Sequence, residues 1–272
     1  MQTAGRQILV PIDFSPHSLL AAKAAAIIAA HRGCRVKLLH ALEQNEDKKE
    51  TTSRIKAFVA DIADEQPATI DANDIAVEVT EGIPEEVILQ IAKDQEPELM
   101  VMGTRRVALK EQDMVGSVAA EVIDGCRVPV LTVPDTTDIG ILAKPRAIAY
   151  LCMMDADDFA ALDVLNSLFA ETAIHLTLIH VPPRRMRLAA PADQWQEMIE
   201  QTRKRYPDWR VTANRITTHT LSDDIARIAG ETPFAILSTA NRRKNVVSRI
   251  LNPSIGHKLL FGADCPVLSL PV

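Results

Sequence analysis

The sequence repeats itself at a spacing close to half its length. The mostly apolar run Glu98-Leu-Met-Val-Met-Gly103 follows Pro97, and a similar run, Phe234-Ala-Ile-Leu-Ser-Thr239, follows Pro233, which lies 136 residues further on. Two more pairs match in the same order: Val36-Lys-Leu-Leu-His40 with Leu176-Thr-Leu-Ile-His180, and Val128-Pro-Val-Leu-Thr-Val133 with Cys265-Pro-Val-Leu-Ser-Leu270. Three matched segments indicate a tandem duplication, so both halves are expected to adopt one fold.

Within each half, segments typical of strands alternate with segments typical of helices. Ser15 and Pro16, for example, follow a branched apolar run and supply an N-cap and a first-turn residue for the next helix. In the first half we expect strands at 7–12, 35–41, 75–80, 99–102 and 130–133, with helices at 17–31, 50–65, 84–93 and 115–123. In the second half we expect strands at 147–152, 174–180, 211–217, 234–237 and 267–270, with helices at 157–170, 192–205, 222–229 and 254–261.

This alternation of five strands and four helices predicts β-α-β crossovers. We therefore expect an α/β fold of two tandem, doubly wound, Rossmann-like domains, each a five-stranded parallel sheet with helices on both faces. Aromatic residues are only 4% of the chain, so the core must be aliphatic, which fits such layers. We place the domains at 1–140 and 141–272, with the linker at 134–146.

Composition excludes several classes of function. The net charge of −6 argues against general affinity for nucleic acid or acidic membranes. A local exception would be a surface made from the basic clusters at 184–187, 203–205 and 242–244 together with Trp195, Tyr206 and Trp209, although such clusters are ordinarily solvated faces. The four cysteines form no C-x-x-C pair, and no segment is long and apolar enough to span a bilayer. We expect a cytoplasmic protein with reduced, mostly buried thiols.

The candidate binding residues follow the first and fourth expected strands. Ligands of doubly wound sheets bind outside the carboxyl ends of the strands, where the strand order reverses. In the first half these positions carry Asp13 and Gly103, and the chain after Gly103 leads to Gly116 and Ser117 at the start of a helix. Main-chain N–H groups and a hydroxyl at such a helix start can hold a phosphate.

At this point the chain resembles the universal stress protein family in its tandem form, over nearly its whole length. The resemblance is carried by Ile8-Leu-Val-Pro-Ile-Asp13-Phe-Ser-Pro-His-Ser18, by Leu99-Met-Val-Met-Gly103-Thr, and by the segment from Gly116-Ser117 to Pro129-Val-Leu-Thr-Val133. ATP-binding members carry G-x2-G-x9-G-[ST] after the fourth strand and an acidic residue near the adenine. The resemblance therefore implies ATP as a ligand of the N-terminal domain.

The second glycine of that motif is replaced. Asp13, Gly103, Gly116 and Ser117 stand where the family pattern requires them, but Arg106 stands where a glycine lets the main chain approach phosphates. Arg106, with Arg105 beside it, can pair with phosphate as a cation, or it can fill the cleft. Both interpretations remain open.

The second half departs further from the pattern. Cys152 or Met153 stands near the position of Asp13, the loop at 238–244 has no glycine, and Asn252-Pro253-Ser254 replaces the Gly-Ser step. Because these changes remove the main-chain features that hold a phosphate, we expect this half to be structural.

Several candidate residues also have structural explanations. Asp13 can organise the turn before Ser15, and Ser117 can cap a helix. Asp155, Asp157 and Asp158 resemble a metal cluster but stand where a helix begins, which the helix dipole favours. His40 and His180 occupy equivalent strand ends, so we expect both to serve a structural purpose such as bonding a nearby carbonyl.

The sequence contains no catalytic signature such as a P-loop or a G-x-S-x-G elbow. We expect a stress-response module that is not an enzyme, or that hydrolyses ATP slowly at most. The family resemblance further implies that the fifth strands pair within one chain and that two chains form a homodimer. The alternative is a nucleotide-free interaction scaffold of the same fold.

Overall fold

The computed structural model describes residues 6–43, 46–64, 74–104, 118–169, 173–180, 192–216, 221–241 and 264–272. The first half contains β1 (Gln7–Pro11), α1 (Pro16–Arg32), β2 (Arg35–Leu42), α2 (Lys48–Asp64), β3 (Ile75–Glu81), α3 (Pro84–Gln95), β4 (Leu99–Thr104), α4 (Val118–Gly125) and β5 (Val130–Pro134). The 3-10 helix η3 (Ile139–Leu142) follows. The second half contains β6 (Ala147–Cys152), α5 (Ala156–Leu168), β7 (His175–His180), α6 (Ala192–Arg205), β8 (Arg210–Arg215), α7 (Leu221–Glu231), β9 (Ile236–Asn241) and β10 (Val267–Pro271).

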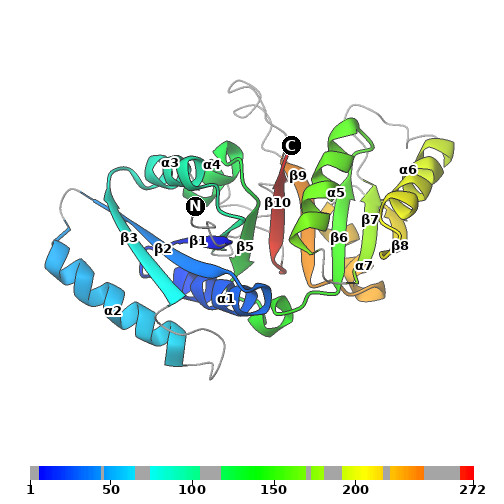
Figure 1. Cartoon of the computed structure of the whole chain (residues 1–272). Helices are drawn as coiled ribbons and strands as arrows, with labels where there is room; N and C mark the ends of the chain where they lie inside the picture. The colour runs from blue at the N-terminus through cyan, green and yellow to red at the C-terminus, as the bar shows by residue number, and fades with distance from the viewer. Residues whose placement is uncertain are drawn as a thin grey trace.

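These strands form one ten-stranded sheet with the order β3-β2-β1-β4-β5-β10-β9-β6-β7-β8. Within each half all neighbouring strands are parallel, whereas β5 and β10 pair antiparallel, with Leu131 opposite Leu268. The expected pair of five-stranded parallel sheets is confirmed, and so is the pairing of the two fifth strands. The seam between β5 and β10 makes the two sheets continuous (Figure 1).

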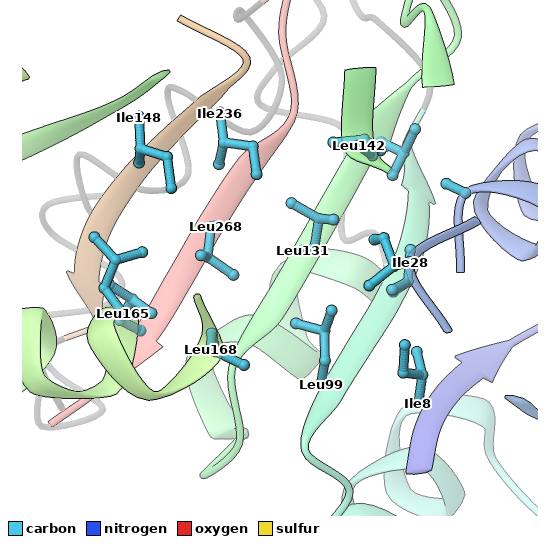
Figure 2. Packing of buried hydrophobic residues seen from close by; sticks show 14 of the residues in the cluster. Ile8, Ile28, Leu99, Leu131, Leu142, Ile148, Leu165, Leu168, Ile236 and Leu268 are labelled. Atoms are coloured by element: carbon cyan, nitrogen blue, oxygen red, sulfur yellow. The ribbon is translucent and has the colours of Figure 1, made fainter. Parts of the chain in front are cut away.

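Helices cover both faces of the sheet. In the first half α1 and α2 lie on one face and α3 and α4 on the other (Figure 1). On the α1 face, one apolar cluster continues across the seam into the second half and includes Leu99, Leu131, Leu268 and Ile236 (Figure 2). The opposite face holds a separate cluster in each half. The two halves therefore share one core on the α1 face.

Helix α1 begins and ends as its sequence predicts. The hydroxyl of Ser15 accepts a hydrogen bond from the Ser18 main-chain N–H at 3.2 Å, Pro16 lies in the first turn, and Gly33 ends the helix with a φ of 63°. The face toward the sheet is rich in fully buried alanines. These small side chains let the helix lie close to β1 and β4, where the candidate site begins.

Several strands differ by one or two residues at an end, and one is displaced from its expected position. We expected a strand at 234–237, but β9 starts at Ile236 and extends to Asn241. Leu99 pairs with the second residue of β1, and Ile236 pairs with the second residue of β6. Leu99 and Ile236 are therefore counterparts in the two halves. The counterpart of Gly103 is therefore Ala240 and not Thr239, because one extra residue separates Pro233 from its strand. Runs of similar apolar residues contain no local signal that sets such a register.

Several expectations concern residues that are not described. The expected helix at 254–261 and the start of the helix expected at 115–123 lie outside the described residues.

The segment expected as a linker contains η3, whose Leu142 is buried in the shared core. Among the helices that are described, none has the length and apolarity required to cross a membrane.

Candidate functional site

The turn between β1 and α1 presents Asp13 at the carboxyl edge of the sheet. Its Oδ1 accepts a hydrogen bond from the main-chain N–H of Ser15 at 3.0 Å, and Phe14 between them has a φ of 61°. Burial alone would raise the pKa of Asp13, but hydrogen bonds from Ser15 and Ser18 outweigh it and lower the pKa below its usual value. Asp13 thus organises the turn, as one interpretation predicted, and remains an exposed carboxylate that is ionised at neutral pH.

Gly103 lies against the first turn of α1. A Cβ atom at this position would be 2.1 Å from the carbonyl oxygen of His17 and 2.4 Å from its carbonyl carbon. No side chain fits there, because the obstacle is main chain that cannot rotate away. The structure therefore brings Gly103 to the same edge as the Asp13 turn, and close helix–strand packing by itself requires a glycine.

The side chain of His17 has a buried ring nitrogen. Its Nδ1 has no hydrogen-bond partner among the described residues. A buried polar atom without a partner costs free energy and calls for an explanation.

The chain that continues from Thr104 carries Arg105, Arg106, Gly116 and Ser117, and these four predicted site residues lie outside the described residues.

His40 and His180 have the shared structural purpose that their repeated position predicted. Nδ1 of His40 donates to the carbonyl oxygen of Ile12 at 3.0 Å, and Nδ1 of His180 donates to that of Cys152 at 3.3 Å. Each histidine thereby ties the end of the second strand of its half to the end of the first. The two differ at Nε2, which contacts Glu46 at 3.1 Å in His40 but in His180 is buried and has no hydrogen-bond partner in the described part of the chain.

The corresponding turn of the second half is closed around a buried carboxylate. Asp158 is fully buried and accepts hydrogen bonds from the Tyr150 hydroxyl at 2.8 Å and from the main-chain N–H groups of Met153 and Asp155 at 3.1 and 3.0 Å. The thiol of Cys152 adds a longer contact at 3.4 Å. Met153, not an acid, occupies the place of Asp13. The turn therefore directs its donors inward.

The acidic group at this helix start has the capping function that its position predicted. Asp155 is the N-cap of α5, and Asp155 and Asp158 form a reciprocal capping box. Sequence reasoning explained the position of Asp158 but missed its burial. The available signal was Tyr150, a hydroxyl-bearing residue inside an otherwise apolar strand, which needs a buried acceptor.

Comparison with known proteins identifies the family. A family model described as the universal stress protein family matches residues 5–134. The first half of the chain is therefore a universal stress protein domain. Two universal stress proteins of Methanocaldococcus jannaschii are similar in sequence. MJ0577 is 26% identical over 157 residues, covering 49% of this chain and 97% of its own length, and MJ0531 is 29% identical over 143 residues, covering 47% and 81%.

A solved structure shows that the arrangement of both halves is a known one. The crystal structure of a universal stress protein from Archaeoglobus fulgidus aligns with a TM-score of 0.72 and 17% identity, and covers 98% of this chain and 96% of that one. At this identity the likeness concerns the fold. It establishes a tandem universal stress protein architecture for the full length of the chain.

The aromatic residues of the second half do not support a nucleic-acid surface. Trp195, Tyr206 and Trp209 are all buried, and the rings of Tyr206 and Trp209 stack with centroids 4.2 Å apart. Arg205 of the nearest basic cluster forms an ion pair with Asp163 at 2.5 Å. The aromatic part of that alternative is therefore wrong, because these rings build the core around α6. The clusters at 184–187 and 242–244 lie outside the described residues.

The four cysteines are free thiols, as expected. Three are buried and Cys265 is partly exposed. Burial raises the pKa of Cys126, and burial together with the charge of Asp264 raises the pKa of Cys265 to about 11. Since the thiolate is the reactive form, both thiols are poor nucleophiles at neutral pH.

Proposed function

We propose that this universal stress protein binds an adenine nucleotide, with ATP as the expected ligand, in its first half only. The observation that supports this is the difference between the two equivalent turns. The first turn presents the ionised, exposed carboxylate of Asp13, whereas the second presents Met153 and directs its donors to the buried Asp158.

The groups of the first half suit the parts of such a ligand. A carboxylate at the end of β1 can accept hydrogen bonds from an adenine amino group or a ribose hydroxyl. The family resemblance assigns the phosphates to Gly116, Ser117 and the loop that carries Arg105 and Arg106. His17, in the first turn of α1 at the same edge, has a buried Nδ1 with no hydrogen-bond partner among the described residues. These residues fit a nucleotide. Bound ATP would supply the phosphates that the basic loop can contact.

The direct test is calorimetry of the full chain with ATP and ADP, together with mass spectrometry of denatured protein to detect a nucleotide retained during purification. Asp13→Asn keeps the acceptor for Ser15 and removes the charge, so it should weaken ATP binding about tenfold, the effect of losing one charge-assisted hydrogen bond. Asp61→Asn, an exposed acid on α2, is the matched control and should bind like the wild type. Absence of both retained nucleotide and binding heat would refute the proposal.

The two interpretations of Arg106 predict opposite results. If Arg106 fills the cleft, Arg106→Gly should create or tighten ATP binding, because the restored glycine lets the main chain reach the phosphates. If Arg106 contacts phosphate, the same substitution should weaken binding. The calorimetric measurement described for Asp13 separates the two.

A nucleotide-free scaffold of the same fold is the second candidate function. It is favoured by the finding that Gly103 and Asp13 both have functions inside the protein, in helix packing and in the turn. We include slow ATP hydrolysis as the only enzymatic activity to test, by phosphate release measured against a heat-killed control. We also propose a cytoplasmic location, since free thiols suit a reducing compartment, and a homodimer, which sedimentation can test.

A further inference from the structure

A cavity of about 160 Å³ lies at the seam between the two halves, on the α1 face of the sheet. Its walls include Leu99 and Ile236, the first residues of β4 and β9, and Arg6, which precedes β1. Asp13 and Gly103 lie at the carboxyl ends of the first-half strands. The cavity is therefore at the opposite edge of that half from the candidate nucleotide site.

The apolar walls come in pairs related by the duplication. Leu131 and Leu268 face each other across the antiparallel β5–β10 pair, and Leu99 and Ile236 are counterparts in β4 and β9 (Figure 2). Ile28 near the end of α1 and Leu168 at the end of α5 add a third pair, and Leu142 and Phe169 also line the cavity. Each half thus contributes equivalent aliphatic side chains, and the joining of the halves creates the cavity.

The polar rim is not symmetric in this way. Among the described residues that line the cavity, every titratable side chain is basic: Arg6, His31, Arg32 and Lys144. All four come from the first half or from the segment that follows η3. A wholly basic rim in a chain of net charge −6 is not explained by the average composition.

Only part of this positive charge is neutralised. The guanidinium groups of Arg32 and Arg6 share one carboxylate, Glu98, with direct contact to Arg32 and 3.9 Å to Nε of Arg6. His31 and Arg32 lie in the last turn of α1, where the negative end of the helix dipole favours basic side chains. Lys144 is beyond that helix, is exposed, and forms no ion pair or hydrogen bond with the residues that are described.

We propose that the seam cavity binds a small amphipathic carboxylate, with its apolar part packed against Leu131 and Leu268 and its carboxylate at the rim beside Lys144 and Arg6. A cavity of about 150 Å³ lined by aliphatic and aromatic side chains accommodates a benzene ring, so a volume of about 160 Å³ suits an apolar group of about six carbons. The apolar walls exclude a strongly hydrated ion, and the basic rim selects an anionic head.

The test is calorimetric titration of the full chain with octanoate, with 1-octanol and acetate as probes that lack the charge or the chain. Octanoate should bind more tightly than either probe. Lys144→Gln should weaken octanoate binding about fivefold, as expected for one partly exposed ion pair. Lys93→Gln, which alters an exposed lysine on α3, should leave the affinity unchanged. Equal affinity for octanoate and 1-octanol, or no effect of Lys144→Gln, would overturn the proposal.

A second variant fills the cavity mouth without cutting into the core. Ser167 is an exposed residue of α5 that lines the cavity, and its hydroxyl donates a hydrogen bond to a main-chain carbonyl of the same helix. Ser53 of α2 is also exposed, and its hydroxyl likewise donates to a main-chain carbonyl of its own helix. Ser167→Trp should abolish octanoate binding, whereas Ser53→Trp should not. Circular dichroism confirms that both variants are folded. Unchanged octanoate binding in folded Ser167→Trp would place the ligand elsewhere and refute the site.

Discussion

Replacing Gly103 by alanine tests the contact that positions the edge of the first sheet. The added Cβ would lie 2.1 Å from the carbonyl oxygen of His17, so α1 and β4 must separate by roughly 1 Å to reach the shortest tolerated contact. Helix α1 resists this displacement because its alanine face is fully buried against the sheet. We expect a loss of about 3 kcal/mol in the free energy of unfolding, at the upper end of the range for overpacking.

Thermal unfolding followed by circular dichroism, without nucleotide, measures this loss. For a chain of this size about 3 kcal/mol corresponds to a decrease in Tm of about 5 °C. Gly230→Ala is the control, because nothing lies within 4 Å of the added Cβ in α7, and it should raise stability by about 0.5 to 1 kcal/mol. If Gly103→Ala unfolds at the wild-type temperature, the close contact with His17 is not present and the packing explanation of this glycine is wrong.

Two further substitutions test the second half. Asp158→Ala should lower the free energy of unfolding by about 3 to 5 kcal/mol, because it removes the acceptor that the Tyr150 hydroxyl and the main-chain N–H groups of Met153 and Asp155 share. Asp155→Ala, which removes the N-cap, should cost only about 1 kcal/mol, and equal losses in urea titrations would contradict this account. Asp163→Asn tests the pH dependence of stability. Hydrogen bonds from Arg205 hold the pKa of Asp163 below its usual value near 3.8, so this stabilisation is complete at neutral pH and is lost as the pH falls through the lower, folded-state pKa. The pair is largely exposed, so urea titrations should show the variant less stable than the wild type by up to about 1 kcal/mol at pH 7, with a smaller difference at pH 3; a constant difference would exclude this linkage.

Most helices and strands could be located from local sequence. β6 (Ala147–Cys152) and α6 (Ala192–Arg205) have the bounds that the sequence predicted, and α1 differs by one residue at each end. Apolar periodicity, an N-cap and a glycine at the helix end are properties of neighbouring residues, so they can be read without knowing the fold. The matching ends of β2 and β7 likewise predicted the shared function of their histidines.

The candidate site was only partly predictable. Asp13 and Gly103 were expected at one edge of the sheet, and the structure places them there. The reason for Gly103 could not be read from the sequence, since it depends on where the main chain of His17 passes. The burial of Asp158 was missed for the same reason, because its donors come together only when the end of β6 meets the first turn of α5.

The amino-acid order alone determined that the chain is duplicated, that each copy alternates strands with helices, and that only the first copy has an acidic residue at the position of Asp13. These are patterns of spacing and residue type along the chain. Tertiary structure decided the one-residue shift of β9, the closure of the second turn over Asp158, and the cavity at the β5–β10 seam with its basic rim. Each of these arises from contacts between residues far apart in sequence, whose geometry is set only when the two sheets pack and join.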